Sequence, residues 1–247
     1  MEISGNTILI TGGGSGIGRA LAHRFNDLGN AVIVTGRHIA PLTETIGERK
    51  HMSAYLLDVE DPSAIKSFAG SLLGDYPGLN VIINNAGVMR YEDMTSARDL
   101  GDAETMVMTN LLGPIRMIDA FVSHLAGQPG SAIVTLSSGL AFVPMIAAPT
   151  YNATKAAIHS YSLSLREQLR GKVEVIEIIP PAVQTDLTPG QVTRDGYLPL
   201  ETFVDQVMAK FRQQPTPEEI VVERARLLRD AEREFRFQAM MKAVNPD

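Results

Sequence analysis

The segment "TILITGGGSGIGRALAHRF", residues 7–25, predicts a buried strand, a glycine-rich turn and a helix. Glycines at 12, 16 and 18 would allow a tight turn, close approach of a pyrophosphate to the backbone and close packing of the helix on the strand. The free N–H groups and the dipole at the start of the helix attract an anion. A glycine-rich turn alone is equally consistent with a structural role. Its place after a first strand favours a dinucleotide site.

The alternation of strand and helix continues along the chain. Short runs rich in Val and Ile predict strands at 7–11, 31–35, 53–57, 80–83, 131–137 and 173–179, and helical patterns lie near 16–28, 40–49, 62–74, 99–126 and 151–170. The strand runs do not alternate polar with apolar residues, as expected when helices cover both faces of a parallel sheet. The order predicts a single-domain α/β Rossmann-type fold, a doubly wound parallel sheet of about seven strands. Asp61 followed by Pro62 predicts the start of one helix.

The last third of the chain is less regular. Residues 180–200, "PPAVQTDLTPGQVTRDGYLPL", contain four prolines and two glycines, and a loop of this length is usually functional or disordered. Within one domain spanning 1–247, we expect a substrate lid over 186–214. A helix near 201–213, a short run at 219–223 and one charged helix from about 224 to 242 would close the chain. The charged helix predicts a solvated amphipathic face, with a partner-binding helix as the alternative.

Composition excludes several classes of function. The 247 residues carry a net charge of −6 and no cysteine, which argues against nucleic-acid binding and excludes disulfides and thiolate metal sites. No apolar run approaches the roughly 20 residues that span a bilayer, and the first strand begins at Thr7, so we expect a cytoplasmic protein without a signal peptide or membrane contact. The histidines lack metal-binding spacing and are expected to be scattered on the surface, with no metal: His23, His38, His51, His124 and His159.

Three motifs carry a family resemblance. "TGGGSGIG", "NNAG" at 84–87 and "TLSSGLAF…TYNATKAA" follow one another in the order found in the short-chain dehydrogenase/reductase family, compact branch. "IIPPAVQTDL", "TGR" and "LSSGLAFVP" most resemble its DltE-like branch. The resemblance implies an NADP(H)-dependent oxidoreductase that moves hydride between nicotinamide and a ketone or aldehyde, or a secondary alcohol. It also implies a catalytic set of Asn110, Ser138, Tyr151 and Lys155.

Tyr151 and Lys155 stand four residues apart, which places them on one face of the predicted helix. In the functional interpretation Tyr151 is the general acid or base. An ammonium about 5 Å away, at an effective dielectric near 20, would contribute roughly 3 kcal/mol toward lowering the phenol pKa. Such a pair alone is more often ordinary packing, and the accompanying motifs favour catalysis.

The resemblance gives the other two catalytic candidates distinct roles. Ser138 would hydrogen-bond the substrate carbonyl, whereas Ser137 is the better candidate for satisfying the strand end. Asn110 would help to hold a water linked to Lys155. The alternative is a buried asparagine bonded to the backbone.

The same resemblance implies the coenzyme contacts. Arg37 follows Gly36, where NAD-selective relatives carry an acidic residue, so NADPH/NADP+ is expected in preference to NADH. Arg37 would pair with the 2′-phosphate, or else be a solvated loop charge, and Asp58 would contact the adenine or cap a loop. Pro181 stands where the family has glycine, and the turn must differ there because proline cannot take positive φ. The full set is Gly12, Gly14, Ser15, Gly16, Ile17, Gly18, Arg37, Asp58, Val59, Asn85, Ala86, Gly87, Tyr151, Lys155, Pro181, Val183 and Thr185.

The substrate side is expected to be mostly apolar. Candidate lining residues are Met89, Leu140, Phe142, Val143, Met145 and Leu187, with Arg90 and Tyr91 as polar groups. They predict a small to medium carbonyl compound or the matching alcohol. A non-catalytic dinucleotide-binding sensor is the main alternative, since fold does not settle function. The glycine spacing of a nucleotide-sugar epimerase is absent. The helices near 99–126 and 151–170 favour a homodimer, with a tetramer as the alternative.

Overall fold

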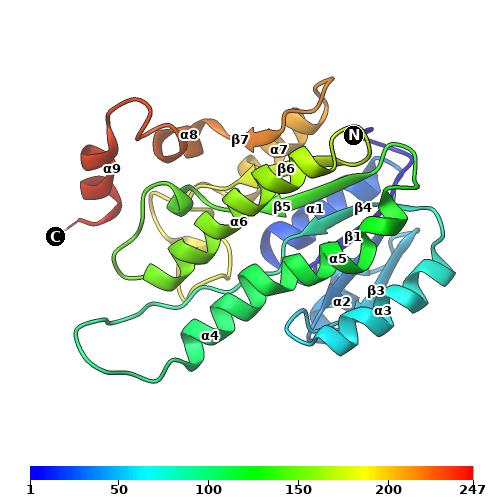
Figure 1. Ribbon diagram of the computed structural model, residues 1–247, viewed down its shortest axis with the longest axis horizontal. Coiled ribbons are helices and arrows are strands. Elements are labelled where there is room, and N and C mark those ends of the chain that lie inside the picture. The colour runs from blue at the N-terminus through cyan, green and yellow to red at the C-terminus, as the bar shows by residue number, and fades with distance from the viewer. Residues whose placement is uncertain (247) are drawn as a thin grey trace.

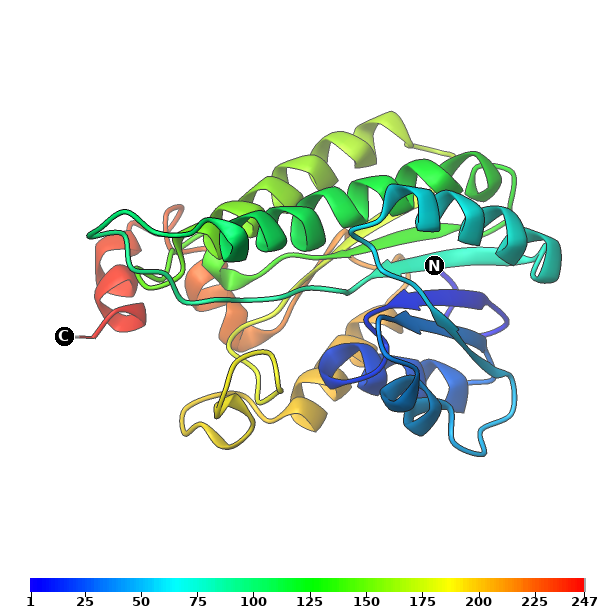
Figure 2. The same ribbon diagram turned by 90° about the horizontal axis from the view of Figure 1, so that it is seen from below.

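In the computed structural model, which describes residues 1–246, one sheet of seven parallel strands lies between two layers of helices (Figures 1 and 2). The strand order is β3-β2-β1-β4-β5-β6-β7. β2 and β3 therefore lie on one side of β1, and β4 to β7 lie on its other side. The predicted doubly wound fold is confirmed. The strands are β1 (Thr7–Thr11), β2 (Ala31–Gly36), β3 (Met52–Leu56), β4 (Leu79–Asn84), β5 (Ala132–Leu136), β6 (Glu174–Ile179) and β7 (Glu219–Val221).

The two faces of the sheet carry separate hydrophobic clusters. Figure 2 shows α1 (Gly16–Asp27), α2 (Ile39–Ile46) and α7 (Leu200–Phe211) on one face, and α3 (Pro62–Asp75), α5 (Gly113–Leu125) and α6 (Pro149–Gln168) on the other. Phe25 of α1 meets Phe211 of α7 with ring centroids 5.3 Å apart, and Phe68 meets Phe121 at 6.4 Å on the opposite face. Burial of both sheet faces explains why the strand runs are apolar throughout. Across residues 1–246, none of the helices has both the length and the apolar character required to cross a membrane.

Helix α3 begins at the position that Asp61 and Pro62 predict. Asp61 Oδ1 accepts hydrogen bonds from the backbone N–H groups of Ser63 at 2.8 Å and Ala64 at 3.1 Å. Pro62 occupies the first turn, where its missing N–H costs nothing. The predicted helix start is therefore confirmed.

The predicted helix at 99–126 is interrupted by a wider turn. It consists of α4 (Gly101–Val107), a π-helical segment (Met108–Leu112) and α5. Asn110 lies at the centre of the π-helical segment. Such insertions occur often at functional positions, because they redirect a side chain without ending the helix.

The prediction of one helix from about 224 to 242 is wrong. The chain forms α8 (Glu223–Arg229) and α9 (Phe237–Val244), separated by a turn. Phe235 takes φ 56°, a left-handed conformation that an α-helix cannot continue through. The Arg236 N–H donates to the Ala231 carbonyl at 2.7 Å and closes the turn. As Figure 1 shows, α9 consequently lies at one end of the molecule, apart from the main helical layers.

Gly18 offers a test of the close packing between α1 and β1. A methyl group there would lie 2.3 Å from the Gly12 carbonyl oxygen and 2.4 Å from Asn85 Nδ2. Because overpacking costs about 1–3 kcal/mol, Gly18→Ala should lower the free energy of unfolding, measured in urea, by about that amount.

The matched control is Gly70→Ala, since nothing lies within 4 Å of a methyl group at this exposed position of α3. This change should raise the free energy of unfolding by about 0.5–1 kcal/mol, the usual advantage of Ala over Gly in a helix. Equal stability of Gly18→Ala and wild type would contradict the packing argument.

Candidate active site

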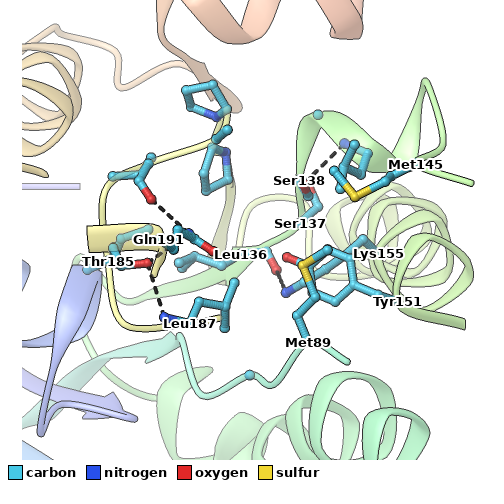
Figure 3. A pocket seen from close by; sticks show the side chains of 18 of the residues that line it. Met89, Leu136, Ser137, Ser138, Met145, Tyr151, Lys155, Thr185, Leu187 and Gln191 are labelled. Carbon is cyan, nitrogen blue, oxygen red and sulfur yellow. Dashed lines mark hydrogen bonds between the residues drawn. The ribbon is translucent and has the colours of Figure 1, made fainter. Parts of the chain in front are cut away.

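A cavity of about 710 Å³ lies at the carboxyl edge of the sheet. Loops that follow β1, β4, β5 and β6 form its walls, together with residues of α8 and α9; Figure 3 shows part of this lining. A second cavity of about 120 Å³ adjoins it where β2 and β3 end. Ligands of open parallel sheets bind at this edge, beside the point where the strand order reverses.

Most predicted coenzyme residues lie on these two walls. Gly14 and Gly18 lie behind them: a methyl at Gly14 would meet Pro41 at 3.1 Å, and Gly18 packs on Gly12. The larger wall includes Gly12, Ser15, Gly16, Ile17, Asn85, Ala86, Gly87, Tyr151, Lys155, Pro181, Val183 and Thr185. The smaller wall includes Gly12, Arg37, Asp58, Val59, Ala86 and Gly87.

The paired cavities fit a dinucleotide. Gly12 has φ 66°, and a methyl group there would lie 2.8 Å from Ala86 Cα, so only glycine keeps the turn this close to the β4 loop. Among residues 1–246, the buried hydroxyls of Thr35 and Ser137 have no hydrogen-bond partner in the protein. Thr35 lines the smaller cavity and Ser137 the larger one.

Tyr151 and Lys155 project from α6 into the larger cavity, with 7% and 6% of their surfaces exposed. The Lys155 Nζ atom lies 5.6 Å from the centroid of the Tyr151 ring. It donates a hydrogen bond to the Leu136 carbonyl at the end of β5, at 2.9 Å (Figure 3). The two side chains therefore share one helix face, as their spacing predicts.

Burial dominates the electrostatics of this pair. It raises the pKa of Tyr151 to about 12, while the neighbouring Ser138 hydroxyl acts in the opposite direction. Burial also lowers the pKa of Lys155 to about 8, opposed by the charge of Glu177. The pKa of Tyr151 is therefore raised rather than lowered in this conformation, because the loss of hydration of the phenolate outweighs the hydrogen bond from Ser138.

Ser138, rather than Ser137, forms the side-chain hydrogen bond at the end of β5. Ser138 Oγ accepts a hydrogen bond from the Leu140 N–H at 3.1 Å and caps the short turn at 139–141. Ser137, the better candidate for satisfying the strand end, has an unpaired hydroxyl. A hydroxyl that accepts one bond still keeps its own proton. Ser138 can therefore donate to a group in the cavity.

The Asn110 side chain is fully engaged with backbone. Its Oδ1 accepts from the Val88 N–H and its Nδ2 donates to the Val88 carbonyl, both at 2.8 Å. The Nδ2 also lies 3.3 Å from Thr154 Oγ1. The side chain thus matches the backbone-bonded alternative, and it fixes the loop after β4. A methyl group at Gly87 in that loop would lie 3.7 Å from Lys155 Nζ, so the loop is held against the lysine.

Arg37 has an acidic neighbour that the sequence reasoning missed. Its Nη1 lies 3.8 Å from Glu60 Oε1, and Glu60 also accepts a hydrogen bond from Thr109 at 2.6 Å. Asp58 Oδ1 accepts from the Glu60 N–H at 3.0 Å, which caps the loop while the carboxyl group lines the smaller cavity. The clue in the sequence was the acidic run "DVED" directly after β3.

The segment after β6 is folded back on itself. Gln184 N donates to Leu198 O at 2.8 Å, and Leu198 N donates to Ala182 O at 2.9 Å. The buried Gln191 donates to the Val183 carbonyl at 2.8 Å and to Thr185 Oγ1 at 3.1 Å (Figure 3). Gln191 therefore fixes a predicted coenzyme contact from within the predicted lid. A glutamine in a loop rich in Pro and Gly gave no sign of this in the sequence.

The substrate side is partly as predicted. Met89, Arg90, Tyr91, Leu140, Met145 and Leu187 line the cavity. Val143 is instead buried in the protein, and the Phe142 ring packs against His159 with centroids 4.7 Å apart. The sequence reasoning missed a whole wall, made by Leu227 and Leu228 of α8 and by Met240, Ala243 and Val244 of α9.

Asn245 holds this wall in place. Its Oδ1 accepts from the Ile146 N–H at 2.7 Å, and its Nδ2 donates to the Pro144 carbonyl at 3.1 Å. These bonds join the end of α9 to the loop that precedes α6. A prediction of one solvated helix could not place α9 here.

Comparison with known proteins gives one consistent result. The family model described as short chain dehydrogenase matches residues 6–195. The chain is 39% identical over 240 residues to the uncharacterized oxidoreductase DltE of Bacillus subtilis (strain 168), covering 94% of each. It is 29% identical over 188 residues to the NADP-dependent 3-hydroxy acid dehydrogenase YdfG of Shigella flexneri, covering 75% of this chain and 72% of that protein. A solved short chain dehydrogenase from Burkholderia cenocepacia J2315, in complex with NADP, has TM-score 0.82 at 22% identity over 99% of both chains.

Gln191→Ala should loosen the segment 186–200. The change removes the bonds to Val183 and Thr185 from a buried position, so amide hydrogen exchange in this segment should become faster by about tenfold or more. Gln213→Ala, at an exposed position after α7, is the control and should leave the exchange unchanged. Equal protection in Gln191→Ala and wild type would show that the segment is held by other contacts.

Proposed function

The chain belongs to the short-chain dehydrogenase family, and on this premise we propose that it is an NADP(H)-dependent oxidoreductase acting on a ketone or aldehyde, or on the matching secondary alcohol. One observation carries the proposal. Ser138, Tyr151 and Lys155 line the same cavity as the glycine turn at Gly12 and Gly16. An acid or base, a carbonyl-binding hydroxyl and an anion-binding turn thus face one space.

Tyr151, Ser138 and Lys155 have separate roles in the proposed reaction. The Tyr151 hydroxyl gives its proton to the substrate oxygen in reduction and takes it back in oxidation. Ser138 donates a hydrogen bond to the same oxygen and stabilises the charge that develops there. Lys155 stabilises the phenolate. The bound coenzyme supplies or accepts the hydride, and its oxidised ring carries a positive charge.

The resting protein favours the acid form of the tyrosine. Because the pKa of Tyr151 is about 12, the phenol keeps its proton at neutral pH and is ready to donate it. Ionisation for the oxidation direction requires more positive charge near the hydroxyl than this arrangement gives. A movement of Lys155 from the Leu136 carbonyl toward the hydroxyl would supply part of it.

The preference for NADPH rests on Arg37. The second strand ends in Gly36 rather than in a carboxylate, and the half-exposed Arg37 guanidinium lies beside the smaller cavity. Glu60, 3.8 Å away, is the group that a 2′-phosphate would displace from Arg37. A relative that shares 29% identity is named as NADP-dependent.

The substrate wall is mainly apolar. Met89, Leu140, Met145 and Leu187 surround the catalytic side chains, and Arg90 and Tyr91 offer polar contacts at the same wall. Such a pocket suits a small to medium carbonyl compound oriented by a few polar groups. A panel of carbonyl substrates with NADPH, followed by coenzyme absorbance, tests the proposal. Coenzyme binding without turnover across the panel would favour a dinucleotide sensor.

Tyr151→Phe should abolish most turnover. The change keeps the ring and deletes only the proton donor, so kcat should fall by about 100-fold or more while coenzyme affinity stays within about twofold. Tyr161→Phe on the same helix is the control, since Tyr161 packs with the apolar residues under α6. Normal turnover by a folded Tyr151→Phe would remove Tyr151 from the mechanism.

Arg37→Ala should weaken NADPH binding by about tenfold to a hundredfold and leave NADH binding nearly unchanged, because a charged hydrogen bond contributes about 1.5–3 kcal/mol. Glu60→Gln should act in the opposite direction and tighten NADPH binding, since it frees Arg37. Calorimetry or fluorescence titration with both coenzymes measures each change. Equal losses for the two coenzymes in Arg37→Ala would show that Arg37 does not contact the phosphate.

A further inference from the structure

A row of polar residues crosses the sheet under α6, outside the cavity. Thr135 of β5 is the register partner of Glu177 of β6, and Glu177 is the partner of Glu219 of β7. Register partners point to the same face, and here α6 covers it: Ser162 Oγ lies 2.8 Å from Thr135 Oγ1. Two carboxylates side by side on adjacent strands repel each other. The row therefore requires partners that donate hydrogen bonds to the carboxylates.

His159 and Arg229 supply those partners. His159 Nδ1, on α6, lies 2.9 and 3.1 Å from the two oxygens of Glu177, which is fully buried. Arg229 of α8 donates to both oxygens of Glu219 at 2.8 and 2.9 Å. The Phe142 ring contacts both side chains, 4.6 Å from the Arg229 guanidinium and 4.7 Å from the His159 imidazole. The expectation that His159 is a scattered surface residue is thus wrong.

The carboxylates of Glu177 and Glu219 bind neighbouring side chains rather than a metal ion. One ligand atom each of His159, Glu177 and Glu219 lies within 4.8 Å of the others, a spacing that a divalent cation could bridge. Arg229, however, takes both oxygens of Glu219 and brings a positive charge to the same place. That charge would repel a metal cation.

Lys155 lies beside one end of this row. Lys155 stands one helical turn before His159 on α6, and its ammonium donates to the carbonyl of Leu136, the residue after Thr135. That carbonyl is neutral, whereas a buried ammonium needs a counter-charge. Glu177 is the group whose charge opposes the effect of burial on the pKa of Lys155.

We propose that Glu177 is a positioning residue of the reaction: its buried carboxylate is the counter-charge that keeps Lys155 an ammonium beside Tyr151, and His159 holds the carboxylate in place. The inference deepens the proposed function and rests on it. The charged and titratable groups around Glu177 are Lys155 and His159 on α6, Glu219 on β7 and Arg229 on α8. Arg166 and Asp230 lie beyond them, beside Glu219 and Arg229. Through Arg229, the network connects the catalytic lysine to the helix that lines the substrate wall.

These charges determine in which direction the pKa of Lys155 moves when the charge of Glu177 is lost. The pKa of Lys155 is about 8, so the side chain is mostly ammonium at neutral pH. Loss of the Glu177 charge removes an attraction for the ammonium and lowers that pKa further, by about one unit or more. In a plot of kcat against pH, the fall in kcat on the alkaline side should move to lower pH by the same amount as the pKa of Lys155.

The first experiment measures the lysine directly and needs no turnover. In protein labelled with ¹³C at the lysine ε carbon, the Lys155 signal is assigned by its loss in Lys155→Met, and its pKa is followed by NMR. Glu177→Gln keeps the shape and an oxygen that accepts from His159 while deleting the charge. Its Lys155 pKa should fall by about one unit or more. Glu167→Gln, an exposed position on α6, makes the same charge change and should leave the pKa unchanged.

An unchanged Lys155 pKa in Glu177→Gln overturns the proposal, and so does binding of Mn²⁺ or Zn²⁺ by wild type that this variant loses. Glu177→Met, similar in length and uncharged, carries the same expectation if the glutamine variant does not fold. The kcat profile with a carbonyl substrate then tests the link to catalysis. A shifted lysine pKa without any turnover would contradict the proposed function and leave the Glu177–Lys155 interaction standing, so the two failures are distinguishable.

Discussion

Helix α1 reaches the end of β1 because no side chain separates Gly18 from the Gly12 carbonyl, and the rest of the site is assembled on that contact. Asn85 Nδ2 donates to the carbonyls of Thr11 and Gly12 at 2.9 and 3.0 Å, in the space that a Gly18 side chain would fill. The Thr11 hydroxyl in turn accepts from the backbone of Asn85 and Ala86, both at 3.1 Å. The β4 loop is thereby tied to the glycine turn, which places Gly87 beside Lys155. The absence of one methyl group thus couples the glycine turn to Lys155.

Burial drives both Tyr151 and Lys155 toward their neutral forms. The raised pKa of Tyr151 and the lowered pKa of Lys155 have the same cause, the loss of hydration in a closed pocket. A neutral phenol is the form that protonates a carbonyl, so the resting state suits one direction of the reaction. The lysine needs help to remain charged, which is why a carboxylate under α6 matters to chemistry that takes place above it.

The sequence was informative where a local pattern determines structure. The strand runs, the cap at Asp61 and the spacing of Tyr151 and Lys155 depend on residues a few positions apart, and the structure has them as predicted. The missed features depend on register or burial. Glu177 and His159 meet only because β6 lies under α6 at one register, and the pKa of Tyr151 depends on surroundings drawn from the whole chain. The break between α8 and α9 depends on the positive φ of Phe235, a conformation that is uncommon for any residue other than glycine and that the sequence does not signal.

The cavity wall formed by α9 is separate from the hydrophobic core of the molecule. None of the α9 residues Phe237–Val244 is buried, and the helix is fastened through Asn245 to the loop at Pro144 and Ile146. The matched family region, residues 6–195, ends before this wall begins. Substitutions in α9 can therefore change the size and polarity of the cavity without touching the sheet core, the glycine turn or the side chains of Tyr151 and Lys155. The cavity can thus be reshaped at little cost to folding.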